Sequence, residues 1–270
     1  MSQASVLKIV QVTDLHLPKN EGQLKHGVSN DARWRAVLDH MVKHHDDLDL
    51  LVLTGDLADA GQPSAYTRLT QDLAKRLPHT ELVWLPGNHD VLSRMRQADQ
   101  EMSHAKGELT RSQWQKYGWQ LLFLDSCAKP DGKGSGSLHP SSVDMLNHLQ
   151  PSSLAPNVLL LMHHHPVPVG SDWQDAVMLG NAQAFWRILA QAKSTRAIDV
   201  KGIIFGHIHQ VYRGEYQNVP LFGSPATAPQ FKPGCASVVR EEGEANQPAY
   251  SIYYLTPDGG VRADVEYVDA

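Results

Sequence analysis

The stretch Leu50-Leu51-Val52-Leu53-Thr54-Gly55-Asp56 is an apolar run that ends in a glycine and a carboxylate, and similar runs recur along the chain. They lie at Leu7–Val12, Leu82–Leu85, Val158–Met162 and Ile203–Phe205, each just before a polar segment. The runs are short, partly β-branched and closed by Gly, Asp or Pro, which favours buried strands over helices. We therefore expect each run to form a buried strand with polar side chains at its end.

Amphipathic helices are expected between these strands. Their apolar positions share one helical face in three segments: Trp34, Val37, Leu38 and Met41; Tyr66, Leu69, Leu73 and Leu77; Phe185, Ile188, Leu189 and Ala192. Ser29 or Asn30 would cap the first helix, while Pro63 would open the second and Pro78 would end it. Strands that alternate with helices predict an α/β layer architecture.

The C-terminal tail has a different pattern. Apolar and polar residues alternate from Val261 to Tyr267, and Pro257-Asp258-Gly259-Gly260 supplies a turn after Ser251–Tyr254. This predicts an antiparallel hairpin, so we expect two packed sheets flanked by helices in a single domain of residues 1–270. The polar, weakly periodic stretch from Ser93 to Lys116 is interpreted as a helical excursion or cap.

Composition excludes several classes of protein. The 270 residues are 41% hydrophobic and 20% charged, with a net charge of -5, which is not the basic footprint of a nucleic-acid-binding protein. No apolar stretch approaches the about 20 residues needed to cross a bilayer, and Met1 to Ser5 do not begin a signal peptide. Cys127 and Cys235 lack a CxxC spacing, which favours reduced thiols in the cytoplasm. The oligomeric state, monomer or homodimer, is left open.

Polar segments follow the apolar runs and supply oxygen and imidazole ligands without thiolates. They are Asp14-Leu15-His16, Gly55-Asp56, Gly87-Asn88-His89-Asp90, His163-His164-His165-Pro166 and Gly206-His207-Ile208-His209. In an extended chain, residues two apart point to the same side, so Asp14 with His16 can face one cavity, as can His207 with His209. Asp56 can bridge two ions through its two oxygens. This chemistry favours Fe or Mn, with Zn as an alternative, over Ca or a closed structural zinc.

The order D-x-H, G-D, G-N-H-D, H-H, G-H-x-H between Asp14 and His209 resembles the calcineurin-like metallophosphoesterase superfamily. The resemblance implies a β-sandwich with helices on its outer faces and two divalent metal ions. It also implies how the ligands are shared: Asp14, His16, Asp56 and His209 for one ion, and Asp56, Asn88, His163 and His207 for the other. Spacing alone allows either His163 or His165 as a ligand, and the resemblance selects His163.

A narrower resemblance covers further residues. They are Trp84–Asp90, the three histidines before Pro166, Gly206–Gln210, Ser224–Thr227 and Gln230–Pro233. These are similar to the class III group of bacterial 3',5'-cyclic-AMP phosphodiesterases. This resemblance implies hydrolysis of a small cyclic nucleotide to 5'-AMP, with no nucleic-acid or membrane partner.

The mechanistic hypothesis assigns a role to each residue. A metal-bridging hydroxide, formed because two ions lower the pKa of the water between them, would attack phosphorus. Asp56 and His89 are the catalytic candidates, and His89 would contact the phosphate or protonate the leaving oxygen. The substrate-binding candidates are His16, Asp56, Asn88, His89 and His209. Two divalent ions, two aspartates and one hydroxide leave a charge of about +1, which selects phosphate but not a diester over a monoester.

Other interpretations are weighed against this hypothesis. Rival activities are hydrolysis of another diester, such as a 2',3'-cyclic nucleotide or a glycerophosphodiester, or of a phosphomonoester. A non-catalytic protein-binding scaffold would have lost ligands, whereas this chain has the full set. For Asp90, a turn or cap role competes with chemistry. Phe231 and Trp173 are candidates for adenine stacking and for the pocket mouth, although aromatic residues serve packing more often. Asp131–Ser137 is interpreted as a surface loop.

Overall fold

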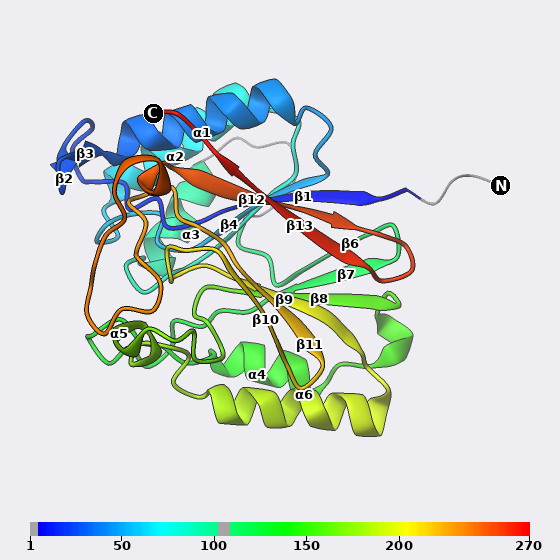
Figure 1. The fold of residues 1–270 in the computed structure, drawn as a ribbon. Coiled ribbons are helices and arrows are strands. Elements are labelled where there is room, and N and C mark those ends of the chain that lie inside the picture. Colours follow the sequence, from blue (N-terminus) through cyan, green and yellow to red (C-terminus); the bar gives the residue numbers. More distant parts are fainter. Residues whose placement is uncertain (1–4, 102–108) are drawn as a thin grey trace.

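Two β-sheets lie face to face, with helices on the outer side of each (Figure 1). The architecture comes from a computed structural model that describes residues 5–101 and 109–270. The first sheet has the order β13-β12-β1-β4-β5, in which β1, β4 and β5 are parallel. Its strands are β1 (Leu7–Val12), β4 (Leu50–Thr54), β5 (Leu82–Leu85), β12 (Ala249–Leu255) and β13 (Val261–Tyr267).

The second sheet has the order β10-β11-β9-β8-β7-β6, with a parallel centre from β11 to β7 and an antiparallel strand at each edge. Its strands are β6 (Gln113–Lys116), β7 (Trp119–Phe123), β8 (Asn157–Met162), β9 (Val200–Phe205), β10 (Tyr212–Tyr216) and β11 (Val219–Gly223). A small separate hairpin consists of β2 (Leu24–Lys25) and β3 (Val28–Ser29).

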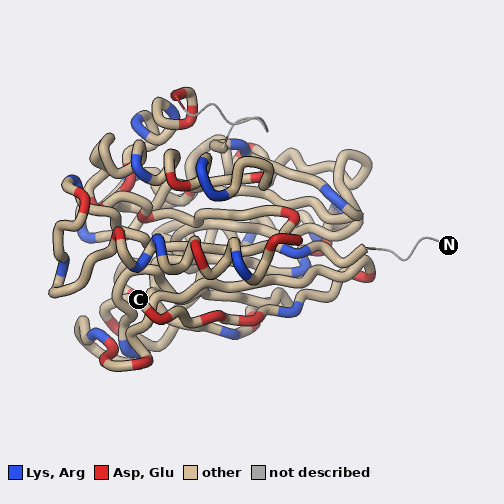
Figure 2. Tube along the Cα trace, turned by 90° about the horizontal axis from the view of Figure 1, so that it is seen from above, with Lys and Arg blue, Asp and Glu red and all other residues tan. Residues whose placement is uncertain are grey.

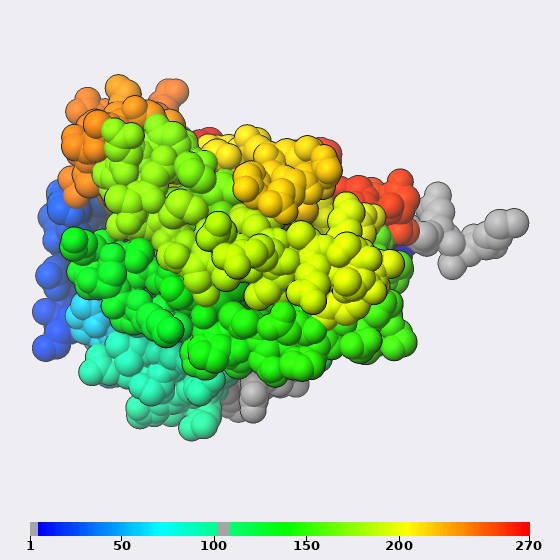
Figure 3. Space-filling view, turned by 90° about the horizontal axis from the view of Figure 1, so that it is seen from below, coloured from blue at the N-terminus to red at the C-terminus, as the bar shows by residue number. Residues whose placement is uncertain are grey.

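Helices cover both outer faces. They are α1 (Asn30–His44), α2 (Pro63–Arg76), α3 (Leu92–Glu101), α4 (Pro140–Asn147), α5 (Asp172–Asp175) and α6 (Ala182–Arg196), with 3₁₀ turns at Pro151–Ser153 and Gly243–Asn246. The first three helices pack on the first sheet. The second sheet is covered by α4 and α6, which form the green and yellow-green surface of the lower face in Figure 3.

The strand alternation explains this layering. In β1, Leu7 and Ile9 are buried in the core between the sheets, whereas Val10 and Val12 contribute to the core beneath the helices. Successive side chains of a strand point to opposite faces, so a strand covered on both sides is mainly apolar. The prediction of two packed sheets flanked by helices is therefore confirmed, and so is the C-terminal hairpin, in which β12 and β13 pair antiparallel.

Local expectations hold with one exception. The Ser29 side chain caps α1 by accepting a hydrogen bond from the Ala32 N–H, so Ser29 rather than Asn30 takes that role. The interpretation of Ser93 to Lys116 as a helical excursion is wrong at its end, because Gln113–Lys116 form β6 and pair with β7. Trp114 is buried from this edge strand against the core between the sheets, which outweighs its polar neighbours. Residues 102–108 of that stretch lie outside the described residues.

The surface carries both signs of charge. Figure 2 shows Lys and Arg interspersed with Asp and Glu over the face that it presents. Within the described residues, no helix combines the length and the apolar character required to cross a membrane.

Candidate dinuclear metal centre

The polar segments that end β1, β4, β5, β8 and β9 meet at one edge of the sandwich. Backbone hydrogen bonds connect the segments that follow β1 and β4. The Asp14 backbone N–H donates to the Gly55 carbonyl over 3.0 Å, and the His16 backbone N–H donates to the Asp56 carbonyl over 2.8 Å. A later segment joins them, because Thr227 N–H donates to the Thr13 carbonyl over 3.0 Å. Main-chain bonding of this kind positions the side chains before any ligand binds.

Asp56 lies between two groups of potential ligands. Its Oδ2 is 3.5 Å from His16 Nε2, and its Oδ1 is 3.5 Å from His163 Nε2. Each carboxylate oxygen therefore faces a different group, which is the geometry that a bridging ligand requires. The Asp56 side chain is only 3% exposed, so its charge lies away from bulk water.

The first group contains Asp14, His16 and His209. His16 Nε2 is 3.2 Å from His209 Nε2, and His209 Nε2 is 3.3 Å from Asp14 Oδ1. Asp14 Oδ2 is already used, because it accepts hydrogen bonds from Thr13 Oγ1 and His207 N–H. Asp14 Oδ1 is buried and has no hydrogen-bond partner, so this oxygen is available to a cation.

The second group contains His163, Asn88 and His207. His163 Nε2 is 3.1 Å from Asn88 Oδ1 and 3.2 Å from His207 Nδ1. The sequence predicted that these residues would act together, and the fold brings them together from three different strand ends. Together with Asp56, each group offers four donor residues without a thiolate, which is a set suited to Fe, Mn or Zn.

Backbone carbonyls orient the imidazoles. His163 Nδ1 is 2.8 Å from the Thr54 carbonyl, and His209 Nδ1 is 2.8 Å from the Pro229 carbonyl. His207 turns the other way, with Nε2 3.2 Å from the Val177 carbonyl. Because a carbonyl can only accept, the nitrogen facing it carries the hydrogen, and the other nitrogen of the neutral ring presents its lone pair to the site.

The orientations of these imidazole rings indicate whether the residues suit metal ions. In the neutral rings, the lone pairs of His163 Nε2 and His207 Nδ1 face each other across 3.2 Å. Two facing lone pairs repel unless a positive charge lies between them. A divalent cation would satisfy both, together with the unpartnered Asp14 oxygen in the neighbouring group, so the donor set fits a pair of metal ions.

The local charges also favour metal binding. Burial and three neighbouring histidines hold the pKa of His207 well below its usual range, and burial lowers that of His16 to about 3 despite the nearby Asp56. Both rings are therefore neutral, as metal ligands must be. Burial opposes protonation of His163 as well, but the Asp56 carboxylate outweighs it and raises its pKa to about 9. A metal ion would replace the proton at His163.

Strained backbone is concentrated at these residues. Asp14, His16, Asp56, His207 and His209 all have φ between 46° and 70°, in the left-handed region. Side chains other than glycine enter this region at a cost of about 1–2 kcal/mol each. Such strain persists only where surrounding contacts impose it, and it commonly accompanies a functional site.

Two glycines allow the strand ends to approach each other. A Cβ at Gly87 would lie 2.2 Å from both the N and the Oδ1 of Asp56, and one at Gly206 would lie 2.1 Å from Thr13 Oγ1. A side chain at Gly87 would therefore displace the backbone of Asp56, and one at Gly206 would displace the side chain of Thr13, which donates to Asp14. The glycines therefore act by the absence of a side chain.

His89 is exposed and stands beside the ligand groups. The backbone N–H of His89 donates to Asp56 Oδ1 over 2.8 Å. The His89 ring meets the His16 ring edge-on, with the ring centroids 4.7 Å apart. His89 Nδ1 donates to the Asp59 carbonyl over 2.6 Å, which leaves Nε2 for other partners. Asp59 itself, which the sequence analysis missed, lies 3.8 Å from His16 Nδ1 through Oδ1 and forms an ion pair with Lys25.

The Asp90 side chain forms hydrogen bonds that hold two loops of the site together. Its carboxylate accepts hydrogen bonds from the backbone N–H groups of Leu57, Ala58 and Gly87 and from the Tyr66 hydroxyl, at 2.8 to 3.1 Å. It therefore ties the Asp56 loop to the Asn88 loop. This arrangement supports the turn interpretation of Asp90 over a chemical one.

The three consecutive histidines occupy different environments. His163 alone reaches Asn88. His164 uses both nitrogens elsewhere, with Nδ1 2.8 Å from Ser126 Oγ and Nε2 donating to the Gly134 carbonyl over 3.1 Å. His165 is fully buried, with both ring nitrogens unpartnered, and stacks near His207 at a centroid distance of 5.6 Å. The geometry therefore favours His163 over His165 as a ligand.

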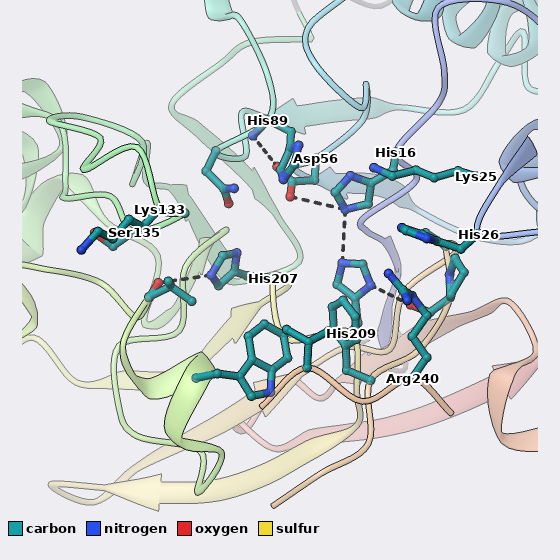
Figure 4. A pocket seen from close by; sticks show the side chains of 18 of the residues that line it. His16, Lys25, His26, Asp56, His89, Lys133, Ser135, His207, His209 and Arg240 are labelled. Carbon is teal, nitrogen blue, oxygen red and sulfur yellow. Dashed lines mark hydrogen bonds and ion pairs between the residues drawn. The ribbon is translucent and has the colours of Figure 1, made fainter. Parts of the chain in front are cut away.

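The ligand groups open into a cavity of about 590 Å³ (Figure 4). His16, Asp56, Asn88, His89, His207 and His209 line it. Lys25, His26, Lys133 and Arg240 also line it, although their local sequence did not predict a place in the site. The loop with Gly132, Lys133, Gly134 and Ser135, interpreted as surface, borders the cavity because His164 holds the Gly134 carbonyl. Only long-range contacts bring these residues to the site, so local sequence gave no signal.

Comparison with known proteins identifies the class. Residues 7–211 match the family described as calcineurin-like phosphoesterase, so the chain belongs to that family of metallophosphoesterase hydrolases. The chain is 33% identical over 262 residues to the 3',5'-cyclic adenosine monophosphate phosphodiesterase CpdA of Escherichia coli (strain K12), covering 96% of this chain and 89% of the relative. It is 30% identical over 270 residues to the 3',5'-cyclic-nucleotide phosphodiesterase alr5338 of Nostoc sp., covering 99% and 95%.

Solved structures share the fold at low identity. A purple acid phosphatase from yellow lupin seeds matches with a TM-score of 0.54 and 14% identity, over 99% of this chain and 55% of that one. GAP50, described as the anchor in the inner membrane complex of Plasmodium, matches with a TM-score of 0.60 and 11% identity, over 98% and 90%. One fold thus occurs in a phosphatase and in an anchor, so function must be argued from the site.

Proposed function

We propose that this protein hydrolyses 3',5'-cyclic AMP to 5'-AMP at a site that holds two divalent metal ions. The proposal rests on the position of the Asp56 carboxylate between two groups of donors. Its Oδ2 lies 3.5 Å from His16 Nε2, and its Oδ1 lies 3.5 Å from His163 Nε2. The cyclic-AMP specificity rests on the relatives, which are named as phosphodiesterases of this nucleotide and match almost the whole chain.

The proposed ligands follow the geometry. Asp14, His16 and His209 would hold one ion, Asn88, His163 and His207 the other, and Asp56 would belong to both. The donor set supports Fe or Mn, with Zn as an alternative. When bound, the ions would activate a water molecule and withdraw charge from the phosphoryl oxygens.

The protein's own residues would orient the substrate and handle the proton. The phosphate of the substrate would lie beside Asn88, His209 and His16. Asp56 would fix the spacing between the two groups of metal ligands. As water adds to phosphorus, the bond from phosphorus to the ribose 3'-oxygen breaks, and that oxygen must gain a proton. His89 is the proposed donor, because Nδ1 is held by the Asp59 carbonyl and Nε2 remains for the leaving oxygen.

The proposal extends to the domain organisation, the partner and the cellular location. We propose that residues 1–270 act as one domain, with a small cyclic nucleotide as the partner rather than nucleic acid or a membrane. Cys127 and Cys235 are free thiols, which supports a location in the reducing cytoplasm.

A substrate panel tests the proposed activity. Protein loaded with Mn²⁺ or Fe²⁺ is assayed on cyclic AMP, cyclic GMP, a 2',3'-cyclic nucleotide, a glycerophosphodiester and a phosphomonoester. We expect the highest kcat/KM on cyclic AMP, with 5'-AMP as product. Faster turnover of the monoester or of another diester would overturn the assignment of substrate, and no turnover of any substrate would favour a scaffold.

A further inference from the structure

The segment of residues 229–240, which we call the strap, borders the cavity on the side of His209. It is closed by an antiparallel bridge between Phe231 and Arg240, and Lys232 N–H donates to the Val239 carbonyl over 2.8 Å. Phe231 N–H donates to the His209 carbonyl over 2.9 Å. The strap is thus built onto a candidate metal ligand, and Phe231, Val238 and Arg240 line the cavity.

An aromatic pair joins the strap to α5. The rings of Trp173 and Phe231 lie 4.9 Å apart at 87°, and the Phe231 ring lies 4.5 Å from that of His209 at 30°. Both aromatic side chains line the cavity and remain partly exposed. This differs from the aromatic side chains that serve packing, such as Trp119 and Phe185, which are fully buried in the cores.

We propose that Trp173 and Phe231 form the subsite that binds the nucleobase of the substrate by stacking. The inference rests on the proposed function and deepens it. The donor groups around Asp56 engage only the phosphate, so the rest of a nucleotide must contact another part of the cavity. Phe231 stands directly against His209, within reach of a nucleoside whose phosphate is at the donor groups, and Arg240 adds a positive charge on the same side.

The chemistry of stacking defines the expected preference. Every nucleobase offers a π face, so an aromatic platform favours substrates with a base over those without one, and it discriminates weakly between adenine and guanine. An aromatic–base stack strengthens binding by about 5- to 100-fold. The subsite would therefore separate cyclic nucleotides from simple phosphodiesters, which the donor groups alone cannot do.

The test compares two substrates that differ only in the base. One is cyclic AMP, and the other is 1-O-methylribose 3',5'-cyclic phosphate, which has the same cyclic phosphodiester. In Phe231→Leu and in Trp173→Leu, we expect the ratio of kcat/KM for cyclic AMP to that for the base-free substrate to fall by about 5- to 100-fold. Phe231→Tyr keeps the ring and should preserve the ratio.

Controls separate the outcomes. Metal content and the thermal unfolding midpoint show whether each variant keeps the fold and the donor groups, and Tyr216→Leu is a matched change of a partly exposed aromatic that does not line this cavity. A ratio unchanged in both leucine variants, with metal content intact, would overturn the subsite. Failure of the wild-type protein to hydrolyse either substrate would instead overturn the proposed function.

Discussion

Replacement of Asp56 by Asn is expected to lower turnover of cyclic AMP by more than about 100-fold, which is the upper end for a residue that merely orients a metal ligand. The amide has the shape of the carboxylate but only one oxygen acceptor and no charge. It cannot serve both donor groups, to which Asp56 now presents one oxygen each at 3.5 Å. We therefore expect the bound metal to fall from two ions per chain toward one.

Elemental analysis of the purified variant measures this loss alongside kcat. Asp39→Asn serves as the matched control, because Asp39 is an exposed aspartate of α1 that pairs with Arg76 on the surface. Near-normal turnover in Asp56→Asn, with both ions retained, would exclude Asp56 as the bridge.

Replacement of His89 by Ala should reduce kcat on cyclic AMP by about 10²–10⁴-fold while metal content stays unchanged. The reason is that His89 contacts Asp56 through its backbone N–H, and its ring Nδ1 is bonded to the Asp59 carbonyl. The ribose 3'-oxygen is a poor leaving group that needs a proton. A diester with a 4-nitrophenolate leaving group needs none, so its hydrolysis should suffer much less.

The comparison of the two leaving groups separates proton donation from binding. His79→Ala is a suitable control, because His79 is exposed beyond the end of α2. Equal losses on both substrates would assign His89 to phosphate binding, and full activity on cyclic AMP would remove it from the mechanism.

The strands that precede the candidate ligands were predictable from the sequence because each one is a mainly apolar run that ends in polar residues. β1 spans Leu7–Val12 and β5 spans Leu82–Leu85, as expected, since strands covered on both faces are mainly apolar. β7 was not predicted, although all of its residues are buried, including Gln120 at 3% exposure. β10 and β11 were missed as well: β10 is a mostly exposed edge strand, and its pairing depends on a neighbour rather than on its own pattern.

Some residues of the site could likewise be predicted from the sequence, and others could not. The ligand types and their order along the chain are local properties, so the donor groups around Asp56 could be anticipated. Spacing could not choose between His163 and His165, because both lie on one face of an extended chain. The family resemblance selected His163, and its Nε2 lies 3.1 Å from Asn88 Oδ1. Lys25, Lys133 and Arg240 reach the cavity through contacts between distant segments, which leave no mark in nearby residues.

The fold alone does not decide between a hydrolase and an anchor, since solved proteins of both kinds share it. In this chain, the carbonyls of Thr54, Pro229 and Val177 set the tautomers of three histidines and direct their other ring nitrogens into the site. A protein that used this surface only for binding would have no physical need to direct two imidazole nitrogens at each other across 3.2 Å. The central claim is therefore that two ions act together on one phosphodiester.

Titration of metal into the chelator-stripped protein tests this claim most directly. Mn²⁺ is added in steps, and both the bound metal per chain and the rate of 5'-AMP formation from cyclic AMP are measured. The account predicts little turnover up to one bound ion and full turnover as the second binds. Full turnover with a single ion bound, or with none, would contradict it.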